Sequence, residues 1–236
     1  MKRQVTILST KKLRPSVLET AMAGGIHIHD LDFIRIRKHV SPETAQALAD
    51  CRDQIVFTSS HAVQAFALNL KESGLTAQTQ QVFCLAGKTL NAVRRLLNPK
   101  KISVAGDAFS LAQLILDTGP TAPLSFVCGS RRRDELPELL KKHDIVLREV
   151  HVYDTLIEPK PVRLAYEGVL FFSPSGVEAF FQVNVLREGI VCFSVGATTA
   201  NELRRLTNNS VIVAAQTSQE SVLDSVINYF GQTKSK

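Results

Sequence analysis

Hydroxyl side chains follow the apolar segments of this sequence at points where a strand would end and a helix would begin. In an open parallel sheet, ligands bind beyond the carboxyl ends of the strands, where helix N-termini present free N–H groups. Hydroxyl and backbone donors at that edge can hold carboxylates. Each residue could instead only cap its helix, because Ser and Thr are preferred N-caps. Taken together, the set favours a polar cleft for an anion: Thr58, Ser59, Ser60, Thr89, Ser173, Ser175, Thr198, Thr199, Thr217 and Ser218.

Two other features add possible chemistry. Ser130 and the basic run that starts at Arg131 follow an expected strand, where they could attract an acidic ligand or form a solvated turn. Tyr153 lies near the end of another expected strand. Its ring could pack with the hydroxyl in water, or its phenol could donate a proton in a cleft.

Three other kinds of site are not supported. Residues 86–89 (AGKT) resemble the end of a phosphate-binding loop, but Val82 stands where that loop needs glycine, which excludes nucleoside triphosphate chemistry. No metal site is expected, because alternation along an exposed strand explains His27, His29, Asp30 and Asp32. Reduced core thiols are expected for the widely spaced Cys51, Cys84, Cys128 and Cys192.

Short apolar segments alternate with helices of about ten residues from residue 54 onward, which predicts doubly wound α/β structure with parallel sheets. Residues 170–180 (LFFSPSGVEAF) align with residues 56–66 (VFTSSHAVQAF) at a displacement of 114 positions, with five of eleven pairs identical. Downstream, residues 88–96 (KTLNAVRRL) correspond to residues 198–206 (TTANELRRL). The sequence therefore predicts two copies of one domain-sized plan.

Residues 26–40 and 145–157 read as two long strands with many charged residues. Such strands suit extended connectors better than a buried core. One would leave the first lobe and the other would return to it. We therefore expect a discontinuous first α/β lobe, residues 1–36 plus 157–236, and an inserted second α/β lobe, residues 37–156.

The chain of 236 residues has a net charge of +6, which suggests an anionic partner. Nucleic acid is not favoured, because no aromatic residues interleave the basic clusters and the chain has no Trp. No apolar run approaches the roughly 20 residues of a membrane helix, and the first residues show no signal-peptide pattern. We expect a cytoplasmic protein with no membrane association, and a monomer because nothing in the sequence demands a partner chain.

The motifs, in their order along the chain, resemble those of the uroporphyrinogen-III synthase family. They cover essentially the whole chain, and their order and spacing are more specific than any one of them. The motifs are FTSSHAV (57–63), KT (88–89), CGSRRRDELPELL (128–140), VYDT (152–155), FFSPSGVEAF (171–180), VGATTANEL (195–203) and AAQTSQESVL (214–223). This sequence departs from the family's usual residues at His61, Phe172 and Ala86.

The resemblance implies two flavodoxin-like lobes with parallel sheets, joined by a two-stranded β connector. It also implies a lyase of tetrapyrrole (haem) biosynthesis that uses no cofactor. In that reaction the linear tetrapyrrole hydroxymethylbilane loses water and closes through a spiro intermediate with its last ring, ring D, inverted. The product is uroporphyrinogen III, whereas unassisted closure gives the uninverted isomer I. Folding the substrate into the right geometry would be the main task of such an enzyme.

The resemblance also assigns roles to residues. Tyr153 matches the family's tyrosine that is thought to help the hydroxyl depart, and the hydroxyl turns match its substrate-binding turns. Combined with the residue patterns above, the expected substrate-binding set is Ser59, Ser60, Thr89, Ser130, Arg131, Ser173, Ser175, Thr198, Thr199 and Thr217. The alternative is a two-lobed binding or sensor protein that closes on a small polyanion and catalyses nothing.

Overall fold

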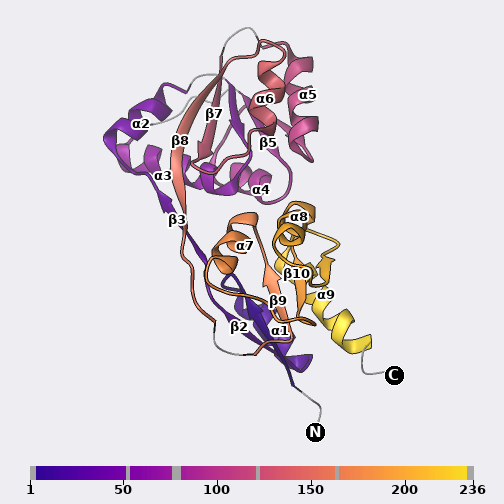
Figure 1. Cartoon of the computed structure of the whole chain (residues 1–236). Coiled ribbons are helices and arrows are strands. Elements are labelled where there is room, and N and C mark those ends of the chain that lie inside the picture. Colours follow the sequence, from indigo (N-terminus) through magenta and orange to yellow (C-terminus); the bar gives the residue numbers. More distant parts are fainter. Residues whose placement is uncertain (1–3, 52–53, 76–80, 121–122, 163–164, 233–236) are drawn as a thin grey trace. The chain divides into compact units, whose positions relative to one another are not determined.

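The computed structural model describes residues 4–51, 54–75, 81–120, 123–162 and 165–232. The chain divides into two compact units. Unit 1 comprises residues 1–35 and 156–236, and unit 2 comprises residues 36–155 (Figure 1). The chain therefore crosses from one unit to the other twice, within strands β3 (Ile34–Lys38) and β8 (Leu147–Ile157).

Unit 1 is built on a five-stranded sheet in the order β11-β10-β9-β1-β2, and every neighbouring pair is parallel. Its strands are β1 (Val5–Ser9), β2 (Ile26–Asp30), β9 (Gly168–Phe171), β10 (Val191–Ser194) and β11 (Val211–Val213). Its helices are α1 (Pro15–Ala23), α7 (Pro174–Phe181), α8 (Ala197–Leu206) and α9 (Gln219–Gln232). Adjacent residues of β1 face opposite cores: Ile7 packs with α1 and α9, and Leu8 packs with α7 and α8.

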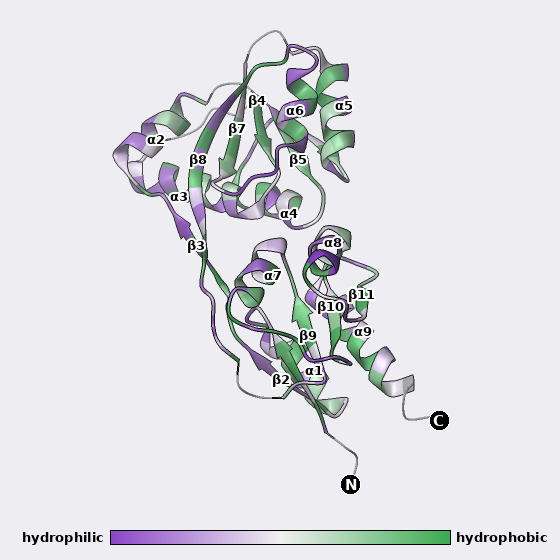
Figure 2. Ribbon diagram, in the orientation of Figure 1, coloured by the Kyte–Doolittle hydropathy of each residue, from purple (hydrophilic) through white to green (hydrophobic). Residues whose placement is uncertain are grey.

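Unit 2 has a six-stranded sheet in the order β3-β8-β7-β4-β5-β6, in which β8 to β6 are parallel. Its other strands are β4 (Gln54–Phe57), β5 (Gln81–Leu85), β6 (Lys101–Ala105) and β7 (Leu124–Gly129). Its helices are α2 (Pro42–Ala49), α3 (Ser60–Ser73), α4 (Lys88–Leu96), α5 (Ala108–Thr118) and α6 (Glu135–Lys141). One face packs against α2, α3 and α4, and the other packs against α5 and α6. Burial on both faces explains the continuous apolar strands, which are green in Figure 2, whereas β3 is purple.

The two sheets have the same strand order once the internal repeat is applied. The repeat equates β4, β5 and β6 with β9, β10 and β11, and the remaining pair β7-β8 then corresponds to β1-β2. In unit 1 this last pair precedes the repeat along the chain, whereas in unit 2 it follows the repeat. The units are therefore circular permutations of one flavodoxin-like plan, in which unit 1 has the strand order 2-1-3-4-5.

The long strand expected over residues 26–40 is instead two strands in two different sheets. Phe33, between them, is fully buried and packs against Phe180, with 5.7 Å between the ring centroids. A buried ring cannot lie in an exposed, continuous ribbon, so the chain turns here. The extended connector is therefore β3 paired with β8. The pairing is antiparallel, because His39 N donates to Val152 O and Glu158 N donates to Phe33 O.

Contacts with neighbouring segments set the ends of two helices. Helix α6 begins only at Glu135, because Arg132 is held by Glu149 of β8 at 2.6 Å and keeps the preceding turn out of the helix. Helix α7 ends at Phe181. Beyond it, Asn184 accepts from Val162 N at 2.7 Å and donates to Lys160 O at 2.8 Å, which fixes the chain in a loop.

Candidate active site

The sheet of unit 2 reverses its direction of winding between β4 and β7. The connection after β4 leads to α3 on one face, and the connection after β7 leads to α6 on the opposite face. Such a switch point is where parallel sheets bind ligands. Here it brings together Ser59 after β4, Gly129 and Ser130 at the end of β7, and Tyr153 on β8.

Tyr153 is held by its hydroxyl and by its ring. The phenol donates a hydrogen bond to Ser59 Oγ at 3.0 Å. Ser59 is the N-cap of α3, and the same oxygen accepts from His61 N at 3.2 Å. The His61 ring lies beside the tyrosine, with 5.8 Å between the ring centroids. With two donors already pointing at Ser59 Oγ, the hydrogen of the Ser59 hydroxyl is left for another acceptor.

The Tyr153 ring lies directly over Gly129. A Cβ atom added at residue 129 would lie 2.3 Å from Tyr153 Cζ, so only glycine fits beneath this ring. The register of β7 against β8 shifts between Cys128 and Gly129, which pairs Gly129 with Tyr153. Ser130 N then donates to Tyr153 O at 3.0 Å. The register shift between β7 and β8 therefore directs the Tyr153 phenol toward Ser59.

The surroundings of Tyr153 keep it in its acid form. Burial raises the pKa of its phenol above the ordinary value of 10.0, and the hydrogen bond to Ser59 offsets part of that rise. At neutral pH the group is therefore protonated and able to donate. It cannot act as a base without first losing a proton that its environment holds tightly.

The next residue, Asp154, contributes to the pairing of the two connector strands, β3 and β8. Hydrogen bonds from His39 and Arg37, at 3.0 and 2.7 Å, hold the pKa of this carboxyl well below its usual range. Both partners are on or beside β3. Successive residues of a strand point to opposite faces, so β8 directs Tyr153 to the site and Asp154 to the pairing of the connector strands.

Unit 1 has an equivalent switch point between β1 and β9. Thr10 follows β1, and its hydroxyl donates to Leu170 O at 2.8 Å. Ser173 follows β9 and caps α7 by accepting from Gly176 N at 3.0 Å. A Cβ at residue 176 would lie 3.3 Å from Ser173 Oγ and 3.6 Å from Thr10 Oγ1, so glycine lets the two hydroxyls approach the helix start.

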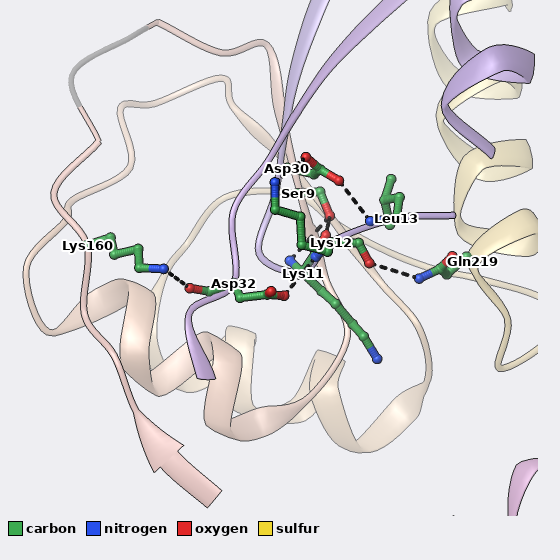
Figure 3. A network of polar contacts seen from close by, with 8 residues as sticks. All are labelled: Ser9, Lys11, Lys12, Leu13, Asp30, Asp32, Lys160 and Gln219. Carbon is green, nitrogen blue, oxygen red and sulfur yellow. Dashed lines mark hydrogen bonds and ion pairs between the residues drawn. The ribbon is translucent and has the colours of Figure 1, made fainter. Parts of the chain in front are cut away.

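Two carboxylates fix the loop that follows β1 (Figure 3). Lys12 N donates to Asp32 Oδ1 and Leu13 N donates to Asp30 Oδ2, each at 2.9 Å. Lys12 Nζ also reaches Asp30 at 3.3 Å. The Lys11 side chain extends away from this network (Figure 3). The acidic residues that could suggest a metal site therefore act as acceptors for backbone N–H groups.

Asp32→Ala should lower the free energy of unfolding by about 1 kcal/mol, because the Lys12 N–H loses its acceptor. Asp32→Asn keeps an acceptor oxygen at the same position and should cost less. Urea unfolding of both variants measures the difference. Equal losses in the two variants would show that the bond to Lys12 N contributes nothing.

The other expected binding residues differ in exposure. Thr89 and Thr199 are largely buried in the first turns of α4 and α8, with 6% and 3% of their surface exposed. Thr198 and Thr217 are exposed, as are Ser130 and Arg131. Thr217 lies close to the start of α8, because its methyl would be 3.5 Å from a Cβ at Gly196. Ser60 and Ser175 are partly buried in the first turns of α3 and α7.

Gly129 and Thr10 belong to these sites, although the sequence patterns above do not select them. A glycine that ends an apolar strand is a sign of a bulge or of a close approach, and Gly129 gives this signal. Thr10 follows the first strand, as the other hydroxyl residues follow theirs. The same rule that selects Ser59 and Ser173 would select it.

Cys128, Glu149 and His151 place possible metal ligands within 4.8 Å of one another. Both oxygens of Glu149 already accept from Arg132, at 2.6 and 2.7 Å. Burial raises the pKa of the Cys128 thiol to about 12, so it stays protonated. This arrangement favours a structural ion pair over a metal site. All four cysteines are free and buried, which confirms the prediction of core thiols.

Two permuted flavodoxin-like units with a two-stranded connector define a class of two-unit α/β proteins, and this one has a partly buried phenol at a sheet switch point. Comparison with known proteins specifies the class. Residues 16–224 match the family described as Uroporphyrinogen-III synthase HemD. The chain belongs to this family, whose members are enzymes of tetrapyrrole biosynthesis.

Solved structures share the fold. A mutant uroporphyrinogen III synthase from Thermus thermophilus is 18% identical, with 97% of this chain and 99% of that chain covered and a TM-score of 0.68. Uroporphyrinogen-III synthetase from Helicobacter pylori is 17% identical, with 95% and 99% covered and a TM-score of 0.64. These likenesses confirm the predicted fold class. Among the described residues, no helix has the length and apolarity required to cross a bilayer.

Proposed function

We propose that this protein is a uroporphyrinogen-III synthase, a hydro-lyase that cyclises hydroxymethylbilane with loss of water and inversion of ring D. The observation that carries the proposal is the family match over residues 16–224. The net charge of +6 suits a substrate with eight carboxylates. No feature of the described residues favours the alternative of a sensor without catalysis.

In the proposed reaction, Tyr153 is the acid that assists departure of the substrate hydroxyl. The phenol turns its hydrogen from Ser59 Oγ to the leaving oxygen, and the C–O bond breaks as water forms. The Ser59 hydroxyl then donates to the phenolate and stabilises it. The proton released when the last pyrrole is restored returns to the phenolate. The hydrogen bond of 3.0 Å between the phenol and Ser59 Oγ supports this pairing of donor and acceptor.

Substrate binding is assigned to exposed and partly buried hydroxyls of both units. We propose Ser60, Ser130, Arg131, Ser173, Ser175, Thr198 and Thr217 as contacts to the substrate, with Ser59 acting through Tyr153. We also propose contacts from the hydroxyls of Thr89 and Thr199, although most of the surface of these two residues is buried in the first turns of α4 and α8. We also propose that the protein is cytoplasmic and monomeric, and that it needs neither nucleic acid nor a second chain.

The decisive experiment is incubation with freshly prepared hydroxymethylbilane, followed by oxidation and chromatographic separation of the porphyrin isomers. We expect isomer III to predominate, whereas the reaction without enzyme gives isomer I. A product mixture identical to the uncatalysed one, from a folded protein, would overturn the assignment. Light scattering of the same sample tests the monomeric state.

A further inference from the structure

A polar pocket of about 290 Å³ lies between α3 and α4 of unit 2. Its size is at the lower end of the range for small-molecule sites, so it suits one substituent better than a whole tetrapyrrole. The buried side chain of Ala92 lies among residues that can donate hydrogen bonds. The lining residues are Ser60, Gln64, Lys88, Asn91, Ala92 and Arg95.

The internal repeat supplies a natural comparison for this pocket. Helices α3 and α4 correspond to α7 and α8 of unit 1, so each lining position has an equivalent. Arg95 corresponds to Arg205, which forms an ion pair with Glu202 at 3.0 Å, one turn earlier on α8. The position of Glu202 is Ala92 in unit 2. Arg95 therefore lacks the acidic neighbour that neutralises its counterpart.

The charges at the two equivalent places have opposite signs. The pocket of unit 2 has two cations, Lys88 and Arg95, and no carboxylate. The equivalent positions of unit 1 hold one cation, Arg205, and two carboxylates, Glu178 and Glu202. Gln64 takes the place of Glu178, so a carboxylate is replaced by an amide of the same shape. Among the described residues, Arg95 and Gln64 have no ion-pair or side-chain hydrogen-bond partner.

We propose that the pocket between α3 and α4 binds one carboxylate side chain of the substrate, with Arg95 as its main cation. A guanidinium offers a planar pair of donors that matches a carboxylate, and the Gln64 and Asn91 amides can donate to the same oxygens. Since unit 1 has net negative charge at the equivalent place, only unit 2 binds an acidic group in this way. This inference rests on the proposed function and names one subsite for its substrate.

Arg95→Gln should raise the KM for hydroxymethylbilane about fivefold and leave kcat within about twofold, as expected for loss of a partly exposed ion pair. Arg94→Gln is the matched control, because Arg94 is the neighbouring exposed residue on α4 and does not line the pocket. Arg205→Gln makes the same change at the equivalent position of unit 1. Both controls should keep the KM of the unmodified protein, and Arg95→Lys should recover part of the loss.

Gln64→Glu tests the pocket without removing a cation. It restores the carboxylate that unit 1 has at this position, and it should raise KM at least as much as Arg95→Gln because like charges repel. Equal KM values for Arg94→Gln and Arg95→Gln, or an unchanged KM in Gln64→Glu, would overturn the subsite. Thermal unfolding of each variant shows whether it is folded.

Two different measurements test the proposed function and the subsite, so that either can fail without the other. If the unmodified protein forms no isomer III, the function is wrong, and the pocket is then tested by binding. For this purpose the same variants are titrated with uroporphyrin I, a stable porphyrin with eight carboxylates, by fluorescence. Weaker binding in Arg95→Gln and Gln64→Glu than in Arg94→Gln supports the pocket, and equal binding in all of them overturns it.

Discussion

Replacing Tyr153 by Phe should slow formation of uroporphyrinogen III about 100-fold, the lower end of the range for loss of a general acid. The ring still packs over Gly129, so the fold should be retained. Only the hydroxyl that donates to Ser59 Oγ at 3.0 Å is removed. The product that does form should still be mainly isomer III, because the site continues to hold the substrate in the geometry for inversion.

Tyr166→Phe is the matched control for this experiment. Tyr166 is a second partly buried phenol whose pKa is raised by burial, but it lies in unit 1, where it contacts His29 at 3.2 Å. The control should retain the normal rate. Initial rates and isomer ratios of both variants separate the contribution of proton donation by Tyr153 from the contribution of substrate positioning. Complete loss of isomer III in folded Tyr153→Phe would contradict the view that positioning contributes more than this one group.

The pH dependence follows from the same environment. The pKa of the Tyr153 phenol is raised above its ordinary value of 10.0 by burial. A raised pKa in the folded protein means that the acid form persists up to and beyond pH 10, and that any stability linked to it is lost only above that pH. We therefore expect no fall in kcat from ionisation of this group below pH 10. A kcat limb near pH 8 that disappears in Tyr153→Phe would contradict the raised pKa of this phenol.

The sequence predicts the α/β class, the internal repeat and most strands, because parallel strands buried on both faces leave strong apolar signals. It also identifies Ser59 and Ser173, since the rule for parallel sheets points to residues just after strands. It does not predict the break at Phe33, because a buried ring within a charged segment shows only in three dimensions. Nor does it predict that Thr89 and Thr199 are buried, since burial depends on packing between neighbouring helices.

The pocket at Arg95 shows a second limit of the prediction from sequence, because a repeat is recognised by its identical residues. The internal repeat aligns residues 88–96 with residues 198–206 because several of their residues are identical. Arg95 and Arg205 are one of these identical pairs. What matters physically is a difference, because Ala92 and Gln64 stand where unit 1 has Glu202 and Glu178. Two lost carboxylates are a stronger functional signal here than the shared arginine. A comparison of charges between duplicated elements can therefore locate such a site from sequence.

Gly129→Ala adds a methyl group at the position with the shortest contact among the glycines that the structure describes. The new Cβ would lie 2.3 Å from Tyr153 Cζ, well inside van der Waals contact, so the ring must move away from Gly129. Overpacking of this kind costs about 1–3 kcal/mol of stability. Movement of the ring also breaks the hydrogen bond to Ser59, so we expect a rate at least as low as that of Tyr153→Phe, measured together with urea unfolding.

Two comparisons isolate the clash between residue 129 and the ring. Gly106→Ala adds the same methyl group where no atom lies within 4 Å, and it should change neither stability nor rate. In a Tyr153→Ala background the ring is absent, so adding the Gly129→Ala change should cost almost no further stability. Such non-additivity is expected only for residues in direct contact. If the two changes add independently, the glycine does not position the phenol, and the role given to the β7 irregularity is wrong.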